Sequence, residues 1–251
     1  MKPPIYIASC SFGKDSIATI LLALENGEPL DRVVFAEVMF DHSRGISGEL
    51  PEHIEWVYST AIPKLEGMGV KVDVVRSEKD YVWFFSHTVG SGKYKGRKYG
   101  FPLGGMCTVN RECKLRPIRK YYGEWKGKYR IVQYVGIAKD EPIRLGRIDG
   151  SRKISLLDKY GYTEAMARQK AEEYGLLSPI YATGSRNGCW FCPNASIKQF
   201  GRFRQAHPDL WAELVNLSHT PNLCSYGFKY GKTVQEIEKL IGWNDRQLKL
   251  F

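Results

Sequence analysis

The sequence has no apolar run long enough to cross a membrane as a helix. Its N-terminus carries one lysine and then enters an apolar segment, so it lacks the long apolar core and the small-residue cleavage site of a signal peptide. Neither an internal repeat nor a low-complexity tract occurs in it. These absences exclude the membrane-spanning and repeat classes, and we expect a cytoplasmic protein without a membrane partner.

Cysteines are few, and the six that occur are spaced too irregularly for a disulfide framework in a cytoplasmic chain. Four of them form two close pairs, Cys107 with Cys113 and Cys189 with Cys192. A C-x-x-C pair can place both sulfurs on one ion, and a second pair can complete a metal or iron–sulfur site. Cys10 and Cys224 stand alone, and a lone cysteine is usually a small buried apolar side chain.

Acidic residues are fewer than basic ones: the chain has 27 Asp and Glu and 37 Lys and Arg, which gives a formal net charge of +10. This excess favours anionic partners such as nucleotides or nucleic acid, although a basic surface can also serve solubility alone. The contents of hydrophobic residues (43%) and charged residues (25%) are ordinary for a globular protein. A length of 251 residues suits one large domain, or one domain with an appendage.

Apolar periodicity predicts strands that alternate with helices in the first half of the chain. Strands are expected over 5–10, 32–40, 70–75 and 130–137, and helices over 14–25, 52–68 and 113–125. The alternation predicts an α/β fold with a mainly parallel sheet of about five strands. Later helices are expected over 163–174, 196–204, 210–217 and 233–241. We therefore predict an α/β domain over 1–150 and a helical C-terminal region over 151–251.

Residues 88–106 interrupt this pattern with glycines and lysines and are expected to form a mobile loop. The loop is not a Walker A motif, since no glycine lies five residues before Gly92 and Tyr94 follows Lys93. Its stretch 93–99 mixes cations with aromatic residues, a composition that can follow a nucleic-acid backbone and stack bases. A basic loop without a partner would have the same composition.

The segment SFGKDS, Ser11 to Ser16, follows the first predicted strand and opens the first predicted helix. In a parallel sheet, ligands bind at the carboxyl ends of the strands, where a helix start offers backbone N–H groups to a phosphate. Gly13 lets the backbone come close, and Lys14 adds a full positive charge. Asp15 would cap the helix or help hold a metal ion. An ordinary capped turn uses the same residue types, so both interpretations stay open.

The same segment resembles the S-G-G-K-D-S signature of the PP-loop ATP pyrophosphatases, with Phe12 in place of the first glycine. Within that superfamily the chain most resembles the phosphoadenosine-phosphosulfate (PAPS) reductase-like branch, and Asp41 matches an aspartate that ends its second strand. Further matches follow in the same order at 49–52, 107–117, 136–144 and 188–193. The resemblance implies an adenine nucleotide α-hydrolase-like fold and cleavage of ATP between its α- and β-phosphates.

The resemblance also implies three groups of site residues. Catalytic roles would belong to Lys14, Asp15 and Asp41. The nucleotide-binding residues would be Ser9, Ser11, Phe12, Gly13, Lys14, Asp15, Ser16, Gly136 and Arg144. Contacts to an anionic part of the substrate would come from Lys114, Arg116 and Glu141. Arg116 shares a predicted helix face with Arg119 and Lys120, which could equally be a solvated face.

The cysteine pairs resemble those of iron–sulfur adenylylsulfate reductases, which place one pair early and a C-x-x-C later. This similarity favours a [4Fe–4S] cluster over zinc on Cys107, Cys113, Cys189 and Cys192. The C-terminal region would then contribute half of the four-cysteine site. Unrelated core cysteines are the alternative, and a cluster could be structural or could relay sulfur.

Several departures from the branch weigh on the function. Ala138 replaces an arginine and Pro142 a serine of the matched segment. The chain ends in WNDRQLKLF and lacks the terminal E-C-G-x-H segment of the sulfonucleotide reductases, whose reaction needs a thiolate. A GKDS loop is more typical of members that bind the triphosphate of ATP.

The leading hypothesis is an enzyme that uses ATP with Mg²⁺, forms AMP and pyrophosphate, and activates an acceptor by adenylylation for sulfur transfer. The acceptor would be a nucleic acid or a small molecule, and a sulfur donor protein would be a further partner. One alternative is a PAPS or APS reductase that lacks the usual C-terminal cysteine. Another is a non-catalytic module that binds nucleotide or nucleic acid around a structural metal.

Overall fold

The computed structural model describes residues 2–102, 107–183 and 188–247. The chain forms two compact units, and each is assembled from three separate segments. The first unit contains residues 1–37, 49–76 and 114–187, and the second contains 38–48, 77–113 and 188–251. This division differs from the single boundary predicted near residue 150, because residues just beyond 150 add a strand to the sheet of the first unit.

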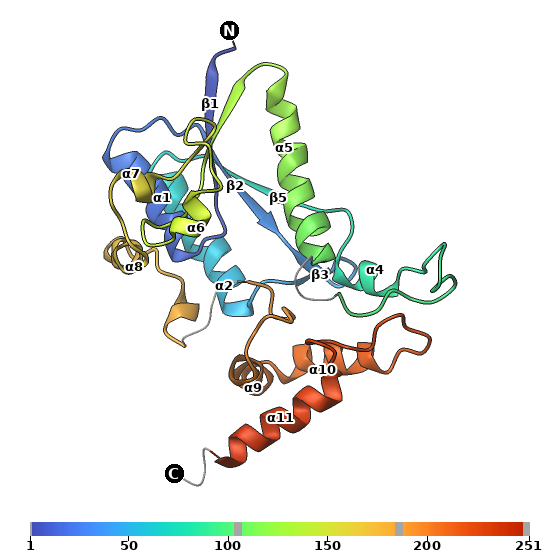
Figure 1. The fold of residues 1–251 in the computed structure, drawn as a ribbon. Coiled ribbons are helices and arrows are strands. Elements are labelled where there is room, and N and C mark those ends of the chain that lie inside the picture. Colours follow the sequence, from blue (N-terminus) through green and yellow to red (C-terminus); the bar gives the residue numbers. More distant parts are fainter. Residues whose placement is uncertain (1, 103–106, 184–187, 248–251) are drawn as a thin grey trace. The chain divides into compact units, whose positions relative to one another are not determined.

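The first unit contains a five-stranded sheet in the order β5-β2-β1-β6-β7, and all neighbouring strands are parallel (Figure 1). The strands are β1 (Pro4–Ser9), β2 (Arg32–Glu37), β5 (Val72–Arg76), β6 (Arg130–Tyr134) and β7 (Lys153–Ile154). In the central pairs, Ile7 lies opposite Arg32 and Pro4 opposite Arg130. The predicted α/β class with a mainly parallel sheet is confirmed.

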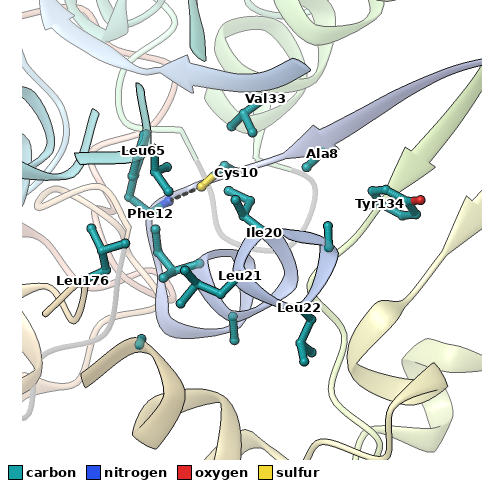
Figure 2. Close-up of a cluster of buried hydrophobic side chains, with 14 of the residues drawn as sticks. Ala8, Cys10, Phe12, Ile20, Leu21, Leu22, Val33, Leu65, Tyr134 and Leu176 are labelled. Carbon is teal, nitrogen blue, oxygen red and sulfur yellow. Dashed lines mark hydrogen bonds between the residues drawn. The ribbon is translucent and has the colours of Figure 1, made fainter. Parts of the chain in front are cut away.

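Helices cover both faces of this sheet, so its strands carry apolar residues on both sides. Ile5 and Ile7 pack with Tyr121 and Tyr122 of α5 on one face. The other face joins a larger core that includes Ala8, Val33 and residues of α1 (Figure 2). The helices of the first unit are α1 (Lys14–Glu25), α2 (Pro51–Trp56), η1 (Val57–Ala61), α3 (Ile62–Gly67), α5 (Arg116–Lys126), α6 (Pro142–Leu145), α7 (Leu156–Lys159), α8 (Glu164–Glu173) and η3 (Pro179–Tyr181).

The helix predicted over 52–68 is present as α2, the π-helical η1 and α3 in succession. Pro63 lies at the start of α3. Proline has no backbone N–H to donate to the preceding turn, and π-turns occur where the regular ladder is interrupted. The helix predicted over 52–68 is therefore interrupted by a π-helical segment just before Pro63.

The second unit has a small antiparallel pair of strands, β3 (Met39–Asp41) and β4 (Ile46–Ser47). Its helices are α4 (Tyr81–Ser86), α9 (Ile197–Ala206), α10 (Pro208–Ser218) and α11 (Val234–Gln247), and the π-helical η2 spans Asn110–Leu115. Aromatic rings fill its interior, and Phe40 lies 4.6 Å from Trp190 and 5.2 Å from Tyr81 between centroids. The strand predicted over 32–40 is thus divided, since β2 ends at Glu37 and β3 belongs to this unit.

The predicted loop 88–106 lies in the second unit, and its residues 103–106 are outside the described residues. Its described part folds back on itself, with Val89 N–H donating to Arg97 at 2.9 Å. Lys98 exchanges backbone hydrogen bonds with the chain at Asn222 and Cys224. The arms of the loop are therefore tied by backbone hydrogen bonds. No helix in the described part of the chain is both long and apolar enough to span a membrane.

Candidate functional site

A pocket of about 670 Å³ opens in the first unit at the carboxyl end of β1. The predicted site residues that line it are Ser9, Ser11, Gly13, Lys14, Asp15, Ser16, Lys114, Gly136 and Arg144. Five basic side chains stand around it, Lys14, Lys114, Arg144, Arg147 and Lys153, against two carboxylates, Asp15 and Glu164. The volume and the positive excess suit a nucleotide with several phosphates.

The loop 11–16 brings the start of α1 into this pocket. Gly13 is the N-cap of α1 in an extended conformation, and as a glycine it has no side chain that could accept a hydrogen bond from the first turn. The Lys14 N–H donates to the hydroxyl oxygen of Tyr181 at 3.1 Å, and the Ser16 hydroxyl donates to the Gly13 carbonyl at 2.9 Å. A helix start carries a partial positive charge and is suited to bind phosphate oxygens.

Gly136, just beyond β6, packs directly against the backbone of this loop. A Cβ atom at Gly136 would lie 2.9 Å from both the Asp15 carbonyl carbon and the Ser16 nitrogen. Both are backbone atoms at the start of α1, so a side chain at position 136 has no room. The structure thus brings the predicted segment 136–144 against the loop 11–16.

Phe12 differs from its predicted role because its side chain does not line the pocket. The ring is fully buried in the hydrophobic core (Figure 2). Its centroid lies 5.1 Å from that of Phe35. Its backbone is left-handed, with φ of 56°, and its N–H donates to Cys10 Sγ at 3.2 Å. Glycine adopts this conformation most easily. Here a buried phenylalanine adopts it, and core packing offsets the backbone strain.

His53 holds the backbone of the loop 11–16 through a hydrogen bond. The side chain is completely buried, with Nε2 3.1 Å from the Ser11 carbonyl oxygen and Nδ1 2.8 Å from Ser178 Oγ. Burial lowers the pKa of His53 to about 4, although the hydrogen bond to Ser11 opposes this shift. The imidazole is therefore neutral at physiological pH and holds the loop through hydrogen bonds.

Lys14 lies between two carboxylates. Its ammonium group is 2.8 Å from Asp15 Oδ1 and 2.9 Å from Glu164 Oε2. Burial lowers the pKa of Lys14, but the hydrogen bonds to Asp15 and Glu164 have the larger combined effect. The pKa of Lys14 is therefore raised. For Asp15, burial raises the pKa and the hydrogen bond from Lys14 opposes the rise. Both carboxylates converge on the position of one cation.

The predicted residues Arg144, Glu141 and Arg116 have different positions. Arg144 lines the pocket and donates from Nη1 to Glu141 Oε1. Glu141 does not line it, but accepts the Ala138 N–H at 3.1 Å and so braces the turn after β6. Arg116 is exposed and is not among the lining residues.

Several pocket residues have no signal in the sequence. Tyr181, Glu164, Arg147 and Lys153 come from segments that lie outside every matched motif. Tyr181, Arg147 and Lys153 lie in short or irregular segments and Glu164 begins helix α8, so only the fold brings these residues to the carboxyl end of β1. His53 directly follows the matched segment 49–52, and this position is the sequence signal that could have indicated a role for it.

Asp41, predicted as catalytic, belongs to the second unit. Its Oδ1 accepts the backbone N–H of Ser43 at 2.9 Å and the Ser43 hydroxyl at 2.6 Å, and its Oδ2 accepts Arg44 Nε at 2.7 Å. Burial raises the pKa of Asp41, but these hydrogen bonds outweigh it and lower the pKa overall. Arg44 also forms a two-pronged pair with Glu213 of α10, at 2.7 and 2.8 Å.

The four paired cysteines all belong to the second unit, and three of them, Cys107, Cys189 and Cys192, lie near Tyr81. Burial raises the pKa of Tyr81 well above its ordinary value, and charges at Cys107, Cys189 and Cys192 raise it further. Cys113 Sγ lies 3.2 Å from the Lys79 carbonyl oxygen. Within the described residues, no three His, Cys, Asp or Glu side chains converge closely enough to hold a metal ion. No chemical step is therefore assigned to a metal at these cysteines.

No protein-family model matches the chain. An uncharacterized protein of Methanocaldococcus jannaschii is 25% identical over 231 residues, covering 86% of this chain and 42% of that protein. An uncharacterized nin region protein of Escherichia phage lambda is 29% identical over 105 residues, covering 42% of this chain and 35% of that protein. The chain thus spans less than half the length of these curated relatives.

Among solved structures, the chain is similar to NcsA, a U34-tRNA thiolase from Methanococcus maripaludis with its [4Fe-4S] cluster. The likeness covers 96% of this chain and 73% of that one, with 18% sequence identity and a TM-score of 0.40. A likeness at that TM-score does not decide the activity of this chain.

Proposed function

We propose that the chain binds ATP in the pocket of the first unit and transfers its adenylyl group to an acceptor, releasing pyrophosphate. The observation that carries this proposal is the start of α1 at a glycine N-cap within a pocket ringed by five basic side chains. A triphosphate carries about four negative charges, and such a ring of cations with a helix start is suited to neutralise them.

In the proposed reaction, an oxygen of the acceptor attacks the α-phosphorus of ATP. The new P–O bond forms as the bond from the α-phosphorus to the α,β-bridging oxygen breaks, and pyrophosphate leaves with that electron pair. The acceptor's proton passes to solvent. A hydrosulfide ion then attacks the activated acceptor atom; the new bond to sulfur forms as the bond from that atom to the adenylylated oxygen breaks, and AMP leaves with that electron pair. The preceding adenylylation supplies the energy, because it turns the acceptor oxygen into a good leaving group. Lys14 and Arg144 stabilise the charge that develops on the pyrophosphate.

The oxygen donors of the pocket fit a divalent cation that accompanies ATP. Asp15 and Glu164 converge on one ammonium group, and carboxylate oxygens are the ligands that Mg²⁺ prefers. When bound with ATP, Mg²⁺ neutralises phosphate charge during bond cleavage. In this proposal Lys14 leaves its two carboxylates for the phosphates, and the carboxylates remain to face the cation.

A sulfonucleotide reductase is less well supported by the same pocket. That reaction needs a reactive thiolate, and Cys10 is the cysteine that lines the pocket. Cys10 is buried, and its burial raises the pKa of the thiol to about 11 despite a hydrogen bond to Ser16. A protonated, inaccessible thiol is a poor nucleophile, so adenylylation is preferred.

The test measures ATP affinity by calorimetry and separates the nucleotide products by chromatography. We expect ATP to give AMP and pyrophosphate, and Lys14→Ala to weaken ATP binding about tenfold or more, as expected for loss of a charged phosphate contact. Lys71→Ala removes an exposed lysine of the same unit and is the matched control. Unchanged ATP affinity in Lys14→Ala, or ADP and phosphate as products, would overturn the proposal.

The four cysteines of the second unit remain a proposed metal site. The support is their shared unit, the aromatic surroundings of Tyr81 and Trp190, and the chemistry of four thiols. The metal would be iron in a [4Fe–4S] cluster or zinc, and the metal content of the purified protein distinguishes the two.

A further inference from the structure

A second cavity, of about 650 Å³, lies in the first unit and is lined mainly by cations. Six basic side chains contribute to it, Lys2, Arg119, Lys126, Arg130, Arg152 and Lys153, against one carboxylate, Asp149. We call this cavity the basic groove. Its walls come from α5 on one side and from β6 and the segment before β7 on the other.

The single carboxylate of the basic groove does little to cancel this charge. Asp149 Oδ1 accepts three backbone N–H groups, from Ser151 at 3.0 Å, Arg152 at 2.7 Å and Lys153 at 2.9 Å. Its Oδ2 is 3.9 Å from Arg152 Nε, too far for a strong ion pair. Asp149 therefore shapes the turn that presents Arg152 and Lys153.

Most of the cations of the groove are available to a ligand. Lys2 donates to the Lys126 carbonyl at 2.7 Å and so caps the end of α5. In the described part of the chain, Arg119, Arg130 and Lys153 form no ion pair, and all three are exposed. A row of unneutralised cations in a concave surface is suited to a chain of negative charges.

The basic groove continues into the candidate nucleotide pocket. Lys153 lines both cavities. Tyr122 of the groove shares a hydrogen bond of 2.7 Å with Ser9 of the pocket. Along α5, Ile118 faces the pocket and Lys126 the groove, and eight residues of helix measure about 12 Å.

We propose that the basic groove binds the sugar–phosphate backbone of a nucleic acid and leads its acceptor atom to the nucleotide pocket. This inference rests on the proposed adenylylation, because it names the class of acceptor for that reaction. A concave row of cations favours a linear polyanion over the flat surface of a membrane. The groove, and not the loop 93–99 of the second unit, is the surface assigned to the backbone.

The test measures binding of a fluorescein-labelled, mixed-sequence RNA of 20 nucleotides by anisotropy, without ATP, between 50 and 200 mM salt (about the range in which phosphate contacts are resolved). The groove variant is Arg119→Glu/Arg130→Glu. The control is Lys71→Glu/Arg168→Glu, which makes the same charge change at two exposed residues of the same unit. We expect the groove variant to lose affinity about tenfold or more and the log–log salt slope to shrink by about 1.4, as for two lost single-strand phosphate contacts. The control should change affinity less than about twofold.

Equal losses in both double variants would overturn the inference, since they would reflect net charge alone. Binding of poly-glutamate as tightly as RNA would also overturn it, because the groove would then recognise any polyanion. If charge reversal prevents folding, Arg119→Gln/Arg130→Gln provides the same comparison. Since the RNA assay contains no ATP, its result is independent of whether the unmodified protein converts ATP to AMP and pyrophosphate, and the two proposals fail separately.

Discussion

At the scale of single residues, the site depends on one place where two backbones nearly touch. Gly136 has no room for a Cβ atom, which would lie 2.9 Å from backbone atoms of Asp15 and Ser16. Its φ is not in the left-handed region, so close approach, and not backbone conformation, demands the glycine. The matched control is Gly123 of α5, where a Cβ would meet nothing within 4 Å.

We therefore expect Gly136→Ala to push the loop 11–16 out of position and to weaken ATP binding about tenfold or more. Gly123→Ala should leave ATP binding unchanged and raise stability by up to about 1 kcal/mol, since alanine favours the helix. Calorimetric titration with ATP and urea unfolding of both variants measure these effects. Normal ATP affinity in Gly136→Ala would show that the loop does not hold the nucleotide.

His53 predicts a dependence of stability on pH. Its pKa is about 4 in the folded chain against 6.5 ordinarily, so the unfolded chain binds more protons between these values. The contribution of neutral His53 to the free energy of unfolding is fully present above pH 6.5. It decreases by about 3 kcal/mol as the pH falls toward and below 4. Urea unfolding across this range should show the decline, and His53→Gln should flatten it. His87→Gln, at an exposed histidine, should leave the slope as it is.

The residues of the loop 11–16 could be predicted from the sequence because they lie together in one motif. The role of Phe12 could not, because a left-handed backbone under a buried ring depends on the core that forms around it. Glu164 and Tyr181 were missed for a related reason. Each reaches Lys14 from more than a hundred residues away, and no local pattern encodes such a contact.

At the scale of helices and strands, the long periodic segments were predicted well. Helix α1 begins at Lys14 and ends at Glu25 as its apolar spacing predicts. The short elements β7, α6 and α7 were missed, because two to four residues cannot establish a period. The predicted strand 32–40 was too long, since a continuous apolar run does not reveal where the chain leaves one sheet for another.

Helix α9 offers a test of local helix signals. Ser196 Oγ accepts the Gln199 N–H at 3.2 Å, and Gln199 Oε1 accepts the Ser196 N–H at 2.8 Å, which together form a capping box. We expect Ser196→Ala to lower the free energy of unfolding by about 1 kcal/mol and Ser196→Gly by only a few tenths (about 0.3 kcal/mol). Thermal unfolding measures both. An unchanged free energy of unfolding in Ser196→Ala would mean that the hydroxyl cap contributes nothing.

At the scale of the whole molecule, the four paired cysteines come from two distant segments that meet in the second unit. Metal binding there should couple to folding, because a site assembled from distant segments does not exist in the unfolded chain. The domain boundary predicted at 150 assigned Cys107 and Cys113 to one domain and Cys189 and Cys192 to the other.

Anaerobic purification followed by metal analysis and an absorption spectrum tests the metal site. We expect a brown protein with about four irons, or a colourless protein with about one zinc. Cys189→Ser/Cys192→Ser should lose the metal and unfold at a lower temperature, whereas Cys224→Ser should keep both properties. If the purified wild-type protein contained neither iron nor zinc, the proposed four-cysteine metal site would be wrong.

The alternation of the chain between the two units determines how the protein can be divided. The polypeptide passes from the first unit to the second and back twice before entering the second a final time, at the carboxyl ends of β2 and β5 and after residue 187. No single protease cut or stop codon therefore separates one complete unit from the other. Truncation after residue 187 would strip the partners from Phe40 and Tyr81, whose rings would face water. Neither unit can be produced alone by shortening the chain from one end. To express one unit by itself, the segments of the other unit must be deleted and replaced by new linkers.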